Sequence, residues 1–101
     1  MANRHLSRSV VLQTLFERDF RNLSVEDTRE AMRRNAQEAA PNGGDTPFMD
    51  ELLMGALARQ KDLDLVIEKA APEWPIERIA PVDRNVLRLG LYELLFADRA
   101  V

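Results

Sequence analysis

The sequence predicts an all-α protein with about five helices. Apolar residues recur three and four positions apart in several segments, which is the spacing that gives a helix one apolar side. No segment alternates apolar and polar residues as a half-buried strand does. Proline and glycine gather between the periodic segments, where they favour turns. These observations predict a bundle of helices that pack through their apolar sides.

The first predicted helix covers about residues 6–20, and a second runs from a serine cap at Ser24 toward Ala39. The side of the first helix expected to face the core carries Val11, Leu12, Leu15, Phe16 and Phe20. We expect Phe20 in the core, whereas Phe16, like Tyr92 near the end of the chain, fits either the core or a surface on which another ring stacks. In the second helix, Asp27 completes the cap, and the expected inward residues are Val25, Thr28, Met32 and Ala36.

A turn at residues 40–46 leads into the longest predicted element, a single helix from about residue 46 to Ala71. Asp45 or Thr46 caps it, and Pro47 suits its first turn. Its apolar pattern consists of Phe48, Met49, Leu52, Leu53, Ala56, Leu57, Leu63, Val66, Ile67 and Ala70. Gly55 lies inside this helix and marks either a close helix crossing or a tolerated substitution.

The last part of the chain is punctuated by proline. Pro72 and Pro75 flank Trp74, which we expect in the core, and residues 76–80 form a short turn. Pro81 then opens a final helix to about Phe96. The side predicted to be buried carries Val82, Val86, Leu87, Leu91, Leu94 and Leu95. A separate edge, formed by Arg84, Arg88 and Tyr92, is expected to be exposed for a partner.

Composition narrows the possible functions. The 101 residues, of which 46% are hydrophobic, suffice for one small domain. No apolar run is long enough for a bilayer, and residues 1–8 lack a secretory hydrophobic stretch, so a cytoplasmic location is expected. The chain has no cysteine and a single histidine, His5. We therefore expect no metal site of the usual His and Cys type and no cofactor. A net charge of −3 argues against a wholly basic nucleic-acid surface.

The amino terminus is the one segment with a basic bias. Arg4 and Arg8 lie one turn apart, so both side chains can point the same way toward phosphate, although two solvated arginines would give the same pattern. His5 suits stacking on a base or simple exposure to solvent. Gln13 suits hydrogen bonding to a base edge or to a neighbouring carbonyl. Phe16 lies on the same predicted helix.

No catalytic constellation is found. The sequence lacks a nucleophile with a base, paired carboxylates in supporting context and a glycine-rich phosphate loop, and residues 42–45 fit a turn rather than a nucleotide cradle. We therefore expect no enzyme activity. Asp83 lies in the first turn of the final helix, where it either complements the helix dipole or contacts a partner.

Three stretches together resemble the NusB family of bacterial transcription antitermination and ribosomal RNA maturation factors. They are residues 4–16, similar to the family's opening "R..AR..A.Q.LY"; residues 48–55, similar to "F...L..G"; and residues 82–94, similar to "(V)(E/D)(R/K)..LR.A.YEL". The resemblance implies a NusB-like helical bundle of two subdomains, expected here at residues 1–71 and 72–101. It also implies binding of boxA-type single-stranded RNA together with the ribosomal protein NusE.

Carried over by position, the resemblance gives two sets of site residues. RNA binding falls to Arg4, Arg8, Gln13 and Phe16, to which we add His5 as the neighbour of the two arginines, and partner binding falls to Asp83, Arg84, Arg88 and Tyr92. Ser7 and Phe16 stand where alanine and tyrosine are usual in the family. Members also continue into two further helices, so the second subdomain looks truncated. We expect a homodimer, or an exchange of helices between two copies, to cover the exposed part of the last helix.

Two other functions fit the same sequence. One is the NusB-like RNA-binding domain of a ribosomal RNA cytosine methyltransferase, which could not catalyse alone because the chain has no cysteine and no cofactor loop. The other is a diverged oligomerisation module that has lost RNA binding. Replacing Arg4 and Arg8 with alanine separates the last possibility from an RNA-binding factor, because only the RNA-binding factor would lose RNA.

Overall fold

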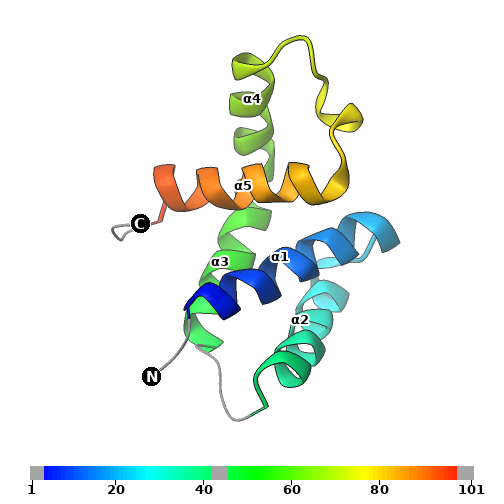
Figure 1. The fold of residues 1–101 in the computed structure, drawn as a ribbon, viewed down its shortest axis with the longest axis vertical. Coiled ribbons are helices and arrows are strands. Elements are labelled where there is room, and N and C mark those ends of the chain that lie inside the picture. The colour runs from blue at the N-terminus through cyan, green and yellow to red at the C-terminus, as the bar shows by residue number, and fades with distance from the viewer. Residues whose placement is uncertain (1–3, 42–45, 98–101) are drawn as a thin grey trace.

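The structure is a computed structural model that describes residues 4–41 and 46–97. Over these residues it consists of helices and contains no strand, which confirms the all-α prediction (Figure 1). The elements are α1 (Arg4–Arg21), α2 (Val25–Ala39), α3 (Thr46–Ala58), α4 (Gln60–Ala70), the 3-10 turn η1 (Ile76–Arg78) and α5 (Pro81–Leu95).

Helix α1 is the centre of the fold, because α2, α3 and α5 all pack against it. Its buried side consists of Ser7, Val10, Val11, Thr14 and Leu15. Two of these are small and polar, and the Thr14 hydroxyl donates to the Val10 carbonyl at 2.8 Å, so it is satisfied within its own helix. Small residues let neighbouring helices approach closely. The core that surrounds this side includes Met32, Phe48, Met49, Leu52, Leu53, Ala56 and Leu63.

The predicted start of α2 is confirmed. The Ser24 hydroxyl accepts the backbone N–H of Asp27 at 3.1 Å, which satisfies one of the amides that a helix leaves unpaired at its first turn. Thr28 and Met32 are buried as expected, and Ala36 is half-buried, but Val25 is exposed. The predicted turn at residues 42–45 and the cap at Asp45 lie outside the described residues.

The single helix predicted from residue 46 to Ala71 is wrong, because it is interrupted at Arg59. The backbone of Arg59 has φ −103° and ψ 9°, which separates α3 from α4. Helical hydrogen bonds still reach across, from the Arg59 N–H to Gly55 and from the Leu63 N–H to Arg59. The interruption is therefore a local bend. No proline or glycine marks it, so apolar periodicity alone could not reveal it.

Helix α5 is turned the opposite way from the prediction. Its buried residues are Asn85, Arg88, Leu89, Tyr92 and Glu93, whereas Val82, Val86, Leu87, Leu94 and Leu95 are exposed. Leu91, the remaining member of the predicted stripe, packs partly buried against the core. The cause is that charged side chains on the inner side meet opposite charges on α1 and α4, as described below. The general rule that charged residues lie on the exposed side of a helix does not predict such buried ion pairs.

Two aromatic predictions are also wrong. Phe20 and Trp74, both expected in the core, are 77% and 69% exposed. Phe20 is displaced because α1 buries the side that carries Ser7 and Thr14 rather than the side that carries Phe16 and Phe20. Phe16 is half-buried, while Tyr92 belongs to the core.

Candidate nucleic-acid and partner interface

The outward side of α1 carries a continuous row of side chains that could contact a ligand. His5, Ser9, Leu12, Gln13, Phe16 and Phe20 recur three and four positions apart and therefore share one side of the helix. The rings of Phe16 and Phe20 are stacked, with centroids 6.0 Å apart and planes inclined by 11°. Residues four apart rise by about 6 Å along a helix, so the stacked rings of Phe16 and Phe20 form a flat pair at one end of the row, and His5 adds a ring at the other end.

A shallow groove of about 280 Å³ runs between this row and α5. Its walls are formed by His5, Arg8, Ser9, Leu12, Val86, Leu89, Gly90 and Glu93. A methyl group on Gly90 would meet nothing within 4 Å, so this part of α5 leaves the groove open. The groove brings the predicted residues His5 and Arg8 together with the last helix, as a shared surface requires.

Arg4 and Arg8 point the same way, as predicted. The Cζ atoms of Arg4 and Arg8 lie 4.4 Å and 5.3 Å from the centroid of the Phe48 ring, which places both guanidinium groups over its face. Arg8 is also paired with Glu93, through Nε to Oε1 at 2.8 Å and Nη2 to Oε2 at 3.0 Å. The alternative of two simply solvated arginines is therefore wrong for Arg8, whose charge is partly neutralised inside the fold.

Gln13 lies beside a polar network that joins α1 to α2. Its side-chain nitrogen is 3.5 Å from the Asn35 side-chain oxygen, and buried Asn35 donates to Thr14 at 3.1 Å and Glu17 at 3.3 Å. The hydrogen bond from Arg34, at 2.6 Å, holds the pKa of the Glu17 carboxyl below its ordinary value of 4.5, while partial burial opposes that shift. Gln13 thus has a structural contact and remains exposed to solvent.

Two of the three residues of the predicted exposed edge of α5 are buried, and the third, Arg84, is half-buried. Arg88 is only 6% exposed and binds Asp64 through two hydrogen bonds, of 2.7 Å and 3.0 Å. Its third contact is with Asp19 of α1, at 3.0 Å. Tyr92 is 7% exposed and lies against Gly55 of α3. The expectation that Arg88 and Tyr92 face a partner is therefore wrong as a statement of their exposure.

Asp19 is the centre of the same cluster. Arg84 and Asn85 reach its Oδ2 atom at 3.2 Å and 3.0 Å, and Arg84 also donates to the Ile76 carbonyl at 3.3 Å. Asp83 differs from its neighbours, because it lies exposed in the first turn of α5, where its charge favours the helix dipole. Asp19, Asp64 and Glu93 are not predicted as site residues from the sequence, since they lie on separate helices and their spacing gives no local signal.

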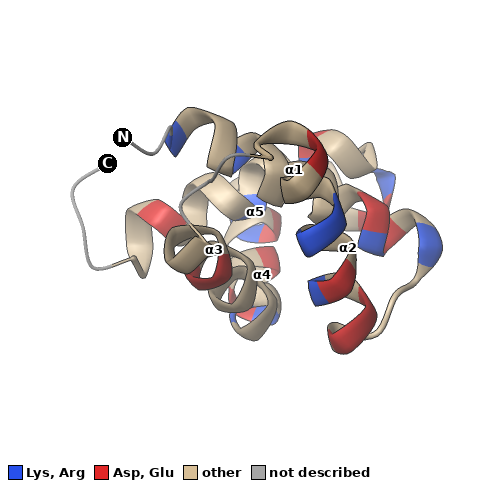
Figure 2. Cartoon of the chain, turned by 90° about the horizontal axis from the view of Figure 1, so that it is seen from below, with Lys and Arg blue, Asp and Glu red and all other residues tan. Residues whose placement is uncertain are grey.

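Charge is mixed over the molecule rather than gathered on one side. Figure 2 shows basic and acidic segments interspersed along the helices, in keeping with the net charge of −3. Within residues 4–41 and 46–97, no group of three metal-binding side chains comes together. None of the helices in this part of the chain has the length and apolar character needed to cross a membrane.

The exposed leucines of α5 form a second surface, the leucine ridge, made of Leu87, Leu94 and Leu95. Leu94 is 69% exposed. At the end of the ridge, Phe96 stacks on Tyr92 with centroids 6.5 Å apart, and the Arg59 Cζ atom lies 4.5 Å from the centroid of the Phe96 ring. Apolar side chains gathered in this way on one helix typically mark an interaction surface.

The chain is similar in sequence to a known protein family. The family model described as NusB family matches residues 5–100. The transcription antitermination protein NusB of Desulfitobacterium hafniense (strain DSM 10664 / DCB-2) is 39% identical over 94 residues, which cover 93% of this chain and 63% of that protein. The transcription antitermination protein NusB of Bacillus subtilis (strain 168) is 36% identical over 95 residues, covering 94% and 67%.

A solved structure has the same fold. A chain in "Crystal Structure of a Plectonemic RNA Supercoil" superposes with a TM-score of 0.85 at 28% sequence identity, covering 98% of this chain and 70% of that one. The chain therefore spans 63% to 70% of the length of these similar proteins. The predicted resemblance and the helical bundle are confirmed.

Proposed function

The chain belongs to the NusB family, and from this premise we propose that it is an RNA-binding transcription antitermination factor that acts as a scaffold rather than as an enzyme. Its RNA ligand is a boxA-type single strand in nascent ribosomal RNA, which it meets in the cytoplasm. The observation that carries the proposal is the outward row of α1, which presents the rings of His5 and Phe16 on the same helix as Arg4 and Arg8.

Single-stranded RNA suits this row for a physical reason. Unstacked bases bind to aromatic and imidazole faces, and each such contact contributes about 1–3 kcal/mol. Phe16 and His5 supply the faces, and Gln13 supplies an amide for a base edge. Arg4 and Arg8 contact phosphates, but two arginines neutralise only about two phosphates, so affinity depends on a second protein.

That second protein is the ribosomal protein NusE, which binds α5. The exposed contacts available to it are Asp83 and the leucine ridge. Arg84, Arg88 and Tyr92 support binding indirectly, by holding α5 in place against α1, α3 and α4. Joint binding of RNA by two linked surfaces supplies affinity that neither protein has alone.

In the absence of the ribosomal protein, we propose that a second copy of the chain covers the leucine ridge. Full burial of a leucine side chain contributes about 1.5–3 kcal/mol, so burial of the whole ridge on both copies favours a symmetric pair. Because both partners use one surface, addition of the ribosomal protein dissociates the homodimer.

The test is a binding titration of labelled boxA RNA by an equimolar mixture of this chain and the ribosomal protein. The mixture binds boxA more tightly than scrambled RNA of the same length, and Phe16→Ala weakens boxA binding by about tenfold, as the loss of one stacked base implies. Trp74→Ala is the matched control, since Trp74 is an exposed aromatic residue in the segment between α4 and η1. Equal binding of boxA and scrambled RNA would disprove the proposal.

A further inference from the structure

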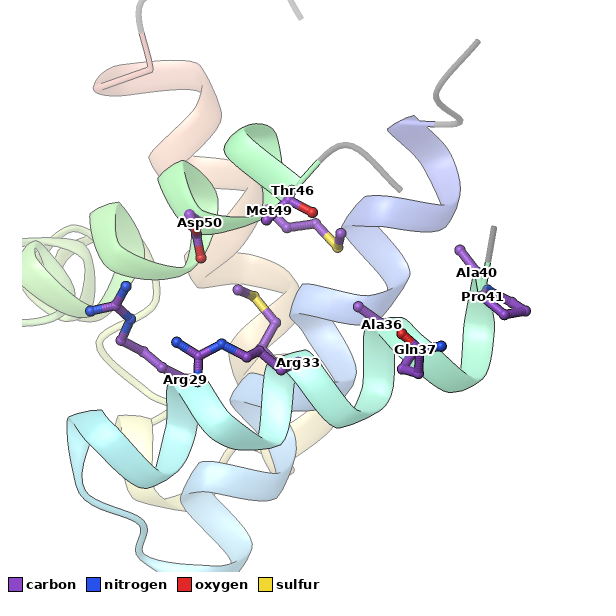
Figure 3. A pocket seen from close by; sticks show the side chains of 10 residues that line it. Arg29, Arg33, Ala36, Gln37, Ala40, Pro41, Thr46, Met49 and Asp50 are labelled. Atoms are coloured by element: carbon purple, nitrogen blue, oxygen red, sulfur yellow. The ribbon is translucent and has the colours of Figure 1, made fainter. Parts of the chain in front are cut away.

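A second groove, of about 350 Å³, lies between α2 and α3 (Figure 3). Both helices pack on α1, and residues of both line the groove. Met32 and Met49 lie at its floor and belong to the core. Its other lining residues are Arg29, Arg33, Ala36, Gln37, Ala40, Pro41, Thr46 and Asp50.

The rim of this groove carries opposite charges on its two sides. Figure 3 shows Arg29 and Arg33 extending from α2 toward the helix that carries Asp50. Arg33 is paired with exposed Glu30 at 2.7 Å. Among residues 4–41 and 46–97, the side chains of Arg29 and Asp50 make no hydrogen bond or ion pair. The groove thus offers two cations one turn apart on one side and an anion on the other.

We propose that this groove binds a short amphipathic helix of a partner protein, with two carboxylates on Arg29 and Arg33 and an apolar side chain over Met32 and Met49. Two carboxylates four residues apart on the incoming helix are separated by about 6 Å along its axis. Arg29 and Arg33 are also four residues apart on α2, so the two spacings match. Asp50 selects a lysine or arginine on the opposite edge of that helix. Methionine side chains adapt to differently shaped apolar partners, and helix-in-groove docking is a common mode of peptide recognition.

Charge favours a protein over RNA as the occupant. Helix α2 carries Glu26 and Asp27 in its first turn and Glu30 between the two arginines, and Asp50 faces them. These carboxylates repel phosphate, whereas a helix with both acidic and basic side chains finds a partner on each rim. The groove also shares no lining residue with the groove between α1 and α5. The two ligands could therefore be bound together.

The experiment uses a labelled helical peptide with Glu at positions i and i+4, Leu at i+3 and Lys at i+6. A second peptide carries Lys in place of both Glu residues. Fluorescence anisotropy measures binding of each peptide to the chain and to the double variant Arg29→Glu, Arg33→Glu. We expect the variant to bind the Glu peptide at least about tenfold more weakly and the Lys peptide more tightly than the unaltered chain does.

The matched control is the double variant Lys61→Glu, Arg78→Glu, which changes net charge equally at exposed residues outside the groove. It retains binding of the Glu peptide, and circular dichroism checks that both variants remain helical. Ala36→Leu fills the groove and weakens both peptides without changing charge.

Three results would overturn this inference. They are no binding of the Glu peptide at about 1 mM, equal binding by the groove variant and the control, and loss of boxA RNA binding in the groove variant alone. The last result would make the groove part of the RNA surface. Failure of the RNA proposal leaves the peptide measurements intact, because the chain binds the peptide without RNA.

Discussion

Gly55 of α3 lies directly against the ring of Tyr92 of α5, and a methyl group on Gly55 would overlap the Cζ and Oη atoms of that ring. The sequence left two explanations for this glycine, and the structure supports the close helix crossing. Tyr92 is thereby held in the core. The crossing fixes the rotation of α5, so it also determines that the leucine ridge faces outward.

Gly55→Ala is expected to destabilise the fold by about 1–3 kcal/mol, because the strain of overpacking exceeds the gain in helix propensity of about 1 kcal/mol. The free energy of unfolding in urea measures it. Gly90→Ala is the control, since its methyl group would meet nothing within 4 Å, and it should stabilise the chain by up to about 1 kcal/mol. Equal stability of the two variants would show that α3 and α5 do not cross at Gly55.

Arg88→Met is expected to cost about 3–5 kcal/mol, because it leaves Asp64 with no cationic partner near the core and removes one from Asp19. Urea unfolding of Arg88→Met, Asp64→Asn and the double variant gives their coupling energy. Arg78→Met, at an exposed position, should change stability by less than about 0.5 kcal/mol. Additive losses would show that Arg88 and Asp64 do not interact.

These charged contacts explain where the sequence analysis succeeded and failed. Helix type and caps depend on neighbours in the chain, so Ser24 and Pro81 identified the starts of α2 and α5 correctly. The inward side of α5 depends instead on Asp19 and Asp64, which lie 69 and 24 residues from Arg88 in sequence. The division at residues 1–71 and 72–101 and the binding roles of the site residues remain predictions.

Glu17 makes stability depend on pH. Hydrogen bonds from Arg34, Arg21 and Asn35 lower the pKa of its carboxyl in the folded chain. A lowered folded pKa means that the stabilisation is present above the ordinary value of 4.5 and is lost as the pH falls below it. Glu17→Gln should flatten the fall in the free energy of unfolding below that pH. Arg34→Gln should flatten it too, whereas unchanged slopes in both variants would contradict this assignment.

Leu94→Gln with Leu95→Gln should convert the proposed homodimer into a monomer, because it removes two exposed apolar side chains from the leucine ridge. Analytical ultracentrifugation at several concentrations measures the change. Val25→Gln, at an exposed apolar position on α2, should leave the homodimer intact. If the unaltered chain is strictly monomeric, the proposed homodimer is wrong. RNA binding together with the ribosomal protein is tested separately, by the boxA titration.

Glu93→Gln should strengthen RNA binding several-fold, because Glu93 neutralises Arg8 at the edge of the groove between α1 and α5. Glutamine keeps the shape of the side chain and an acceptor oxygen for Arg8. The lost negative charge leaves more of the guanidinium charge for phosphate, so RNA affinity should fall more steeply with salt. Arg8→Gln should weaken RNA binding and make it less dependent on salt. Titrations of boxA RNA at two salt concentrations measure both effects, with Glu68→Gln, an equal charge change at an exposed position on α4, as control. Equal gains from Glu93→Gln and Glu68→Gln would mean that net charge, rather than the Arg8 pair, governs RNA affinity.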